Sequence, residues 1–128
     1  MKYLLFLTTV VFLGCSDSIT NPGEEIIFPL SKISFNRQVQ PFFYQNCTLS
    51  GCHNETDKKS NLDLSSYGAA RQRFYDVIIP KDTTLSRIIW SIERRSGSPA
   101  MPPGKILSST QIKGIKTWIM EGATDSIP

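Results

Sequence analysis

Apolar residues in the central part of the chain recur at helical spacing. Phe35, Val39 and Phe42 stand at positions i, i+4 and i+7, so they share one face of a helix. Ser34 precedes them and is a favourable N-cap residue. We therefore expect a first helix that begins after Ser34. Pro41 lies inside this pattern and lacks a backbone N–H, so it should kink or split the helix.

Two shorter helical segments are expected in the middle of the chain. The first covers about residues 67–74, with Ser65 as its cap. Pro80 then interrupts the chain, and Thr83 or Thr84 can start the second segment. Its apolar stripe consists of Leu85, Ile88, Ile89 and Ile92.

The last helix has the clearest sequence signals at both ends. Ser108 and Gln111 stand three residues apart and form a capping box, and Gly122 suits a left-handed C-terminal cap. Its apolar face consists of Ile112, Ile115 and Ile119, flanked by Trp118. No convincing series of alternating apolar and polar residues indicates a strand. The sequence therefore predicts an all-α domain of about four helices joined by long loops.

The start of the chain looks like an export signal. Lys2 precedes an apolar run over residues 3–13, which is too short for a bilayer span of about 20 residues but suits a signal peptide. The run ends in Phe12-Leu13-Gly14-Cys15, which resembles the lipobox of bacterial lipoproteins. We expect residues 1–14 to be removed and Cys15 to be lipidated. An ordinary secretory leader cut near Gly14 is the alternative.

These signals divide the chain into three parts. Residues 15–33 form a lipidated N-terminus and a tether, in which the apolar residues 26–28 could pack on the domain as a short extended piece. Residues 34–125 form the domain. The protein is then expected to be exported and anchored to a bacterial membrane by lipid, facing the periplasm or the cell surface.

Charge gives no sign of a nucleic-acid partner. The formal net charge is only +3, and Lys2 would leave with the leader. Basic residues occur as short pairs rather than as a run interleaved with aromatic residues, so their default interpretation is solvated surface. We expect no nucleic-acid partner.

The segment Cys47-Thr48-Leu49-Ser50-Gly51-Cys52-His53 carries the chemistry. Two cysteines followed at once by a histidine are what covalent haem attachment needs, because the thiols add to the vinyl groups and the histidine binds the iron. The usual form is C-x-x-C-H, whereas four residues separate the cysteines here. Gly51 makes the required bulge sterically easier. His53 is the only histidine of the chain, so a second iron ligand must be another residue type.

Met101 is the expected second ligand. Haem iron held between histidine and methionine is the pattern of cytochromes c. Met101 precedes Pro102 and Pro103 in a loop rich in Gly, Ser and Pro, where the prolines stiffen the segment. Met120 falls in the last helix and is interpreted as a packing residue. A domain of about 90 residues also has a thin core, which a buried haem would complete.

On these residues the chain resembles a class I c-type cytochrome domain, from Phe35 to about Ala123. Phe43 and Trp118 match the aromatic residues that pack the first helix against the last in this family. The resemblance implies one covalent haem c, a cytochrome c-like fold around it, and a role as a carrier of single electrons. It also implies redox protein partners and neither an enzymatic activity nor a small-molecule substrate. The matching positions are Cys47, Cys52, His53 and Met101-Pro102.

Three other interpretations fit parts of the sequence. A disulfide between Cys47 and Cys52 could staple a haem-free lipoprotein that binds a partner. A zinc site at Cys47, Cys52 and His53 lacks a clear fourth ligand. A haem enzyme such as a peroxidase needs polar groups beside an open iron position, and no second histidine is available for that work.

Overall fold

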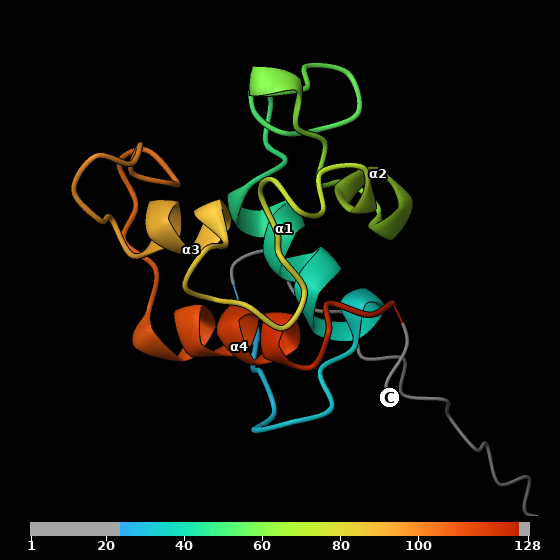
Figure 1. Ribbon diagram of the computed structural model, residues 1–128. Helices are drawn as coiled ribbons and strands as arrows, with labels where there is room; N and C mark the ends of the chain where they lie inside the picture. Colours follow the sequence, from blue (N-terminus) through green and yellow to red (C-terminus); the bar gives the residue numbers. More distant parts are fainter. Residues whose placement is uncertain (1–23, 126–128) are drawn as a thin grey trace, which may run out of the picture.

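The computed structural model describes residues 24–125, and the expected leader and Cys15 lie outside this range. The described part contains four α-helices, two short helical turns of other types and no β-strand, only two isolated bridges (Figure 1). The all-α architecture is therefore confirmed. In chain order the elements are η1 (Phe35–Val39), α1 (Gln40–Asn46), η2 (Lys59–Asn61), α2 (Tyr67–Arg71), α3 (Arg87–Ile92) and α4 (Ser109–Met120).

The first helix is split where the sequence predicts a split. Ser34 is its N-cap, and its hydroxyl accepts the N–H of Arg37. The N–H groups of Val39 and Gln40 reach back five residues, so η1 is a π-type turn. Pro41 then lies in the first turn of α1, where its missing N–H costs little.

The expected cap of α2 was wrong by one residue. The Oγ atom of Ser66 accepts the N–H of Ala69 and caps the helix. The hydroxyl of Ser65 instead donates to Asp63 at 2.6 Å. Asp63 also accepts the N–H of Ser65 at 2.9 Å, which folds residues 63–65 into a turn, so the cap falls on the next residue.

The start expected for α3 was also wrong. Asp82 accepts both the N–H and the hydroxyl of Thr84, at 2.8 and 2.7 Å, which folds this segment into a turn. The helix therefore begins at Arg87. Leu85 lies before it and is 57% exposed, so it does not belong to the buried stripe. The buried residues of α3 are Ile88, Ile89 and Ile92.

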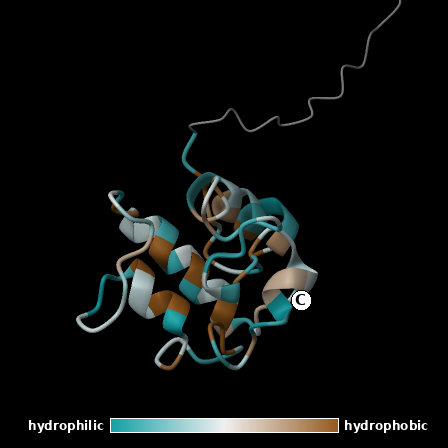
Figure 2. Cartoon of the chain, turned by 90° about the horizontal axis from the view of Figure 1, so that it is seen from above, coloured by the Kyte–Doolittle hydropathy of each residue, from teal (hydrophilic) through white to brown (hydrophobic). Residues whose placement is uncertain are grey.

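The core lies where the N-terminal helical segments meet α4. The Trp118 ring contacts those of Phe35 and Phe43, with centroids 5.8 and 6.4 Å apart, and all three are fully buried. The expected contact between Phe43 and Trp118 is thus confirmed. The capping box of Ser108 and Gln111 also forms. Figure 2 shows hydrophobic and hydrophilic positions mixed along the helices, as expected for helices that bury one face.

Residues 24–33, here called the N-terminal strap, pack on this core. Ile26 is buried, and the ring of Phe28 lies edge-on to Phe42 at 5.8 Å. The N–H groups of Lys32 and Ile33 donate to the carboxylate of Glu121 at 2.6 and 2.9 Å. From Ile26 onward, the segment that the sequence assigns to a tether therefore lies on the domain. No helix within residues 24–125 is long and apolar enough to cross a membrane.

Candidate functional site

A cavity of about 200 Å³ lies between the segment after α1, α3 and the loop after α3. Cys47, His53 and Met101 all line it, so the structure brings together three of the four residues that the sequence singles out. Cys52 is half-buried and is not among the lining residues; its sulfur lies 3.7 Å from the carbonyl oxygen of Ser50. The apolar part of the wall includes Leu62, Leu64, Val77, Ile88, Ile92 and Pro99.

Backbone hydrogen bonds fold the Cys47–His53 segment back on itself. The N–H of Cys47 continues α1 by donating to Phe43 at 2.7 Å. The N–H of His53 donates to the carbonyl of Cys47 at 3.0 Å, which closes the loop. Gly51 has a φ of +75° at the tip, a conformation that glycine adopts without steric cost. The four intervening residues therefore form a bulge that returns the histidine to the first cysteine.

The imidazole of His53 is oriented by one hydrogen bond. Its Nδ1 atom lies 2.9 Å from the carbonyl oxygen of Lys59. A carbonyl oxygen only accepts, so Nδ1 carries the proton. The lone pair of Nε2 is then free to bind a metal, which is the arrangement typical of metal-ligating histidines.

Burial raises the pKa of the Cys47 thiol from 9.0 to about 12. The neighbouring Cys52 acts in the same direction, and Lys105 opposes them. Cys47 is therefore a protonated thiol at neutral pH. Cys47 and Cys52 are both free thiols in the structure.

The loop that carries Met101 is fastened to α3. The N–H of Met101 donates to the carbonyl of Ser91 at 3.1 Å. The guanidinium of Arg94 donates to the carbonyl of Lys105 at 2.7 Å, on the far side of the two prolines. Met101 is half-buried in the cavity wall. Met120 is 53% exposed and faces a separate groove along α4.

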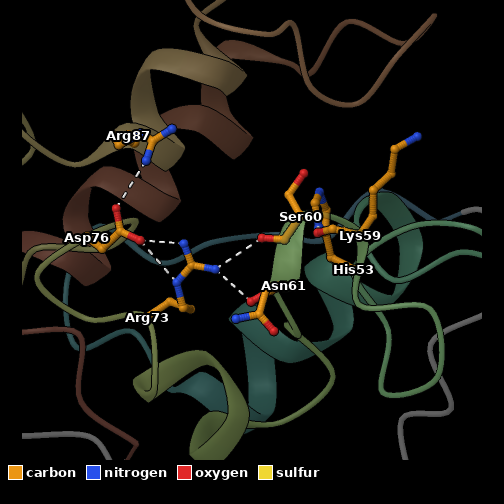
Figure 3. A network of polar contacts seen from close by, with 7 residues as sticks. All are labelled: His53, Lys59, Ser60, Asn61, Arg73, Asp76 and Arg87. Carbon is orange, nitrogen blue, oxygen red and sulfur yellow. Dashed lines mark hydrogen bonds and ion pairs between the residues drawn. The ribbon is translucent and has the colours of Figure 1, made fainter.

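Two arginines complete the cavity wall, and sequence reasoning did not find them. Arg73 and Arg87 both line the cavity and both donate to the carboxylate of Asp76 (Figure 3). These bonds hold the pKa of Asp76 below its usual value. The spacing of three residues between Arg73 and Asp76 could have indicated an ion pair. Nothing in the sequence indicates that this pair lies beside a cavity. Two cations and one anion leave this wall with a net positive charge.

Comparison with known families agrees with this geometry. The family model described as planctomycete cytochrome C matches residues 50–105. The match supports a cytochrome c-like domain. It contains Cys52, His53 and Met101, begins three residues after Cys47, and covers less than half of the chain. No curated protein and no solved structure gave a match.

The donor set of this cavity fits a covalent haem. It combines an aliphatic wall, two thiols in or beside the site, an imidazole with a free Nε2 and a thioether. The cavity is smaller than the roughly 300–1,000 Å³ of pockets for small organic ligands, so a porphyrin requires the bordering loops to move apart. Among residues 24–125 no three His, Cys, Asp or Glu residues cluster as a metal site, so the zinc interpretation gains no support.

Proposed function

We propose that this chain is a membrane-anchored monohaem cytochrome c that carries single electrons. The observation that carries the proposal is the convergence of Cys47, His53 and Met101 on one largely apolar cavity. These residues come from segments up to 54 positions apart, yet they supply the types of side chain that hold a c-type haem. The match to a cytochrome family supports the same assignment.

Each residue has a distinct role in this proposal. Cys47 and Cys52 would hold haem c through thioether bonds, while His53 and Met101 would be the ligands of its iron. When bound, the haem supplies reversible one-electron chemistry. The protein fixes the imidazole through Lys59, keeps the thioether loop against α3, and surrounds the site with aliphatic side chains that exclude water.

An electron carrier explains the ligand set better than an enzyme does. With His53 and Met101 both bound to the iron, a substrate would have no iron position to occupy. The chain has no second histidine to assist a reaction beside the iron. Its partners are then redox proteins that dock transiently, as is typical of small electron-transfer interfaces.

The anchor is the second part of the proposal and is supported by the sequence alone. Lipidation of Cys15 in the lipobox-like leader would hold the exported domain at a bacterial membrane, facing the periplasm or the cell surface. A Cys15→Ser variant that is still exported should appear in the soluble fraction. Continued membrane association of that processed variant would contradict the lipid anchor.

A haem-attachment assay tests the proposed cofactor. The protein is purified from a host with haem-attachment machinery, extracted with acid-acetone, and analysed by pyridine haemochrome spectroscopy. We expect c-type bands at about one haem per chain that survive extraction, and none in a Cys47→Ala/Cys52→Ala variant. A wild-type protein without haem that carries a Cys47–Cys52 disulfide would overturn the proposal and favour a haem-free binding lipoprotein.

A further inference from the structure

The turn that holds His53 has an unfavourable backbone. Lys58, Ser60 and Asn61 have φ values of +41°, +59° and +55°, in the left-handed region that side chains other than glycine disfavour. Between them, Lys59 supplies the carbonyl that accepts the Nδ1–H of His53. Contacts from outside the turn must therefore hold it in this shape.

The N–H of Lys59 donates to the carbonyl of Cys52 at 3.0 Å, and Arg73 supplies the side-chain contacts. Its Nη1 atom donates to the carbonyl of Asn61 at 2.6 Å and to that of Ser60 at 3.2 Å. Its Nε and Nη2 atoms donate to one carboxylate oxygen of Asp76 on the opposite side (Figure 3). The Arg73 side chain is only 23% exposed. Four of the five N–H groups of the guanidinium are thus committed to protein acceptors.

We infer that Arg73 is a positioning residue for the axial histidine. Oriented by Asp76, its guanidinium clamps residues 60 and 61, so that the carbonyl of Lys59 holds Nδ1–H and leaves Nε2 of His53 free for the iron. These contacts, here called the clamp, are present without haem. Their role toward iron rests on the proposed function. Lysine cannot replace arginine here, because an ammonium lacks the planar fork that spans three acceptors.

Two variants of Arg73 and one control separate this role from that of charge. Arg73→Lys keeps the positive charge but loses the fork, and Arg73→Gln loses both. Arg87→Gln removes an equal charge and another ion pair of Asp76, but Arg87 has no hydrogen bond to the 58–61 turn. Asp76→Asn keeps the guanidinium and weakens its orientation. Thermal unfolding first identifies the variants that fold.

The readout is the imidazole of His53 in the haem-loaded full chain, observed by NMR with nitrogen-15 labelling. The chain has one histidine, so the ring signals have a single source. We expect the solvent-exchange rate of Nδ1–H to rise at least tenfold in Arg73→Lys and Arg73→Gln, to rise less in Asp76→Asn, and to stay within twofold in Arg87→Gln. Unchanged exchange in the Arg73 variants, or an equal rise in Arg87→Gln, would overturn the inference.

Failure of the proposed function is detected separately. Haem content is measured on the same samples, and absence of haem from the wild type sinks the electron-carrier proposal but not the clamp. The clamp is then tested on the haem-free chain through the two tautomers of His53. We expect the Nδ1–H tautomer to dominate in the wild type and Arg87→Gln, and to lose its dominance in Arg73→Lys. Equal tautomer ratios in all three proteins would refute the clamp.

Discussion

At the residue scale, the half-buried Cys47 offers a direct test of its environment. Its pKa is raised to about 12 by burial, while an exposed cysteine has the value 9.0. The nucleophile is the thiolate, whose fraction near pH 8 is then lowered about a thousandfold. The pKa is raised in the folded state, so the thiol stabilises the haem-free fold below pH 9. This contribution is lost as the pH rises from 9.0 toward 12.

We therefore expect Cys47 of the haem-free folded chain to react with iodoacetamide at pH 8 at least tenfold more slowly than in denaturant. Its rate should keep rising up to pH 10 without a plateau, because the titration midpoint lies higher. Site-resolved mass spectrometry measures the rate, with the denatured chain as the reference. A plateau between pH 8 and pH 9 would show that the surroundings of Cys47 do not raise the pKa of its thiol.

Met101 and Met120 form a matched pair for the axial ligand. Met101 lines the cavity, whereas Met120 is 53% exposed and lines another groove. In the loaded protein, Met101→Ala should lower the reduction potential and abolish the near-infrared thioether band, because a methionine ligand raises the potential. Met120→Ala should change neither. If Met101→Ala keeps the wild-type potential and band, Met101 is not the ligand.

The sequence predicted the residues whose chemistry depends on local spacing. Cys47, Cys52 and His53 lie within seven positions, so their combination is visible without a fold. Met101 was expected as the second ligand because of the two prolines after it, and it lines the same cavity as Cys47 and His53. Arg73 could not be found this way, because its role depends on a turn 12 and 13 positions earlier that only the folded chain brings to it.

At the element scale, the N-terminal strap can approach α4 closely because Gly114 of α4 has no side chain. A Cβ atom on Gly114 would stand 2.1 Å from Cγ of Phe28, well inside van der Waals contact. Glycine in the middle of a helix costs about 1 kcal/mol relative to alanine, yet here it lets the strap approach. This contact explains why the strap lies on α4.

Gly114→Ala should therefore destabilise the protein by about 1–3 kcal/mol, although alanine is the better helix former. Urea unfolding followed by circular dichroism measures this change. In a Phe28→Ala background the same substitution should become neutral or stabilise by up to about 1 kcal/mol. Equal effects of Gly114→Ala in both backgrounds would show that the ring of Phe28 does not lie on this helix.

Helix caps were predicted well only where no carboxylate two positions earlier accepts the backbone N–H of the expected cap residue. Ser108 and Gln111 cap α4 as expected because they satisfy each other's backbone groups. Thr84 and Ser65 are equally suitable by residue type, but Asp82 and Asp63 bind their hydroxyls. Turns closed by short-range carboxylates thus shifted the cap of α2 and the start of α3, an effect that residue preferences alone do not capture.

At the scale of the whole molecule, packing and chemistry occupy different parts of the fold. The fully buried aromatic residues gather where η1, α1 and α4 meet. Residues 47–61 contain no buried side chain, and residues 93–106 contain one, Pro102. These two segments supply Cys47, His53 and Met101 to the cavity. Segments with so few buried contacts open at low free-energy cost.

If the proposed haem is bound in this cavity, it should therefore stabilise the two loops more than the helical core. We expect a Cys47→Ala/Cys52→Ala variant, which cannot attach haem, to exchange amide hydrogens at least tenfold faster in residues 54–61 and 93–106. Exchange in α1 and α4 should rise much less, because Phe43 and Trp118 pack without the cofactor. Hydrogen-exchange mass spectrometry compares the variant with the loaded wild type, and Met120→Ala serves as a control that leaves the cavity intact. A uniform rise across loops and helices would mean that the core does not form without haem, since local opening cannot accelerate every segment equally.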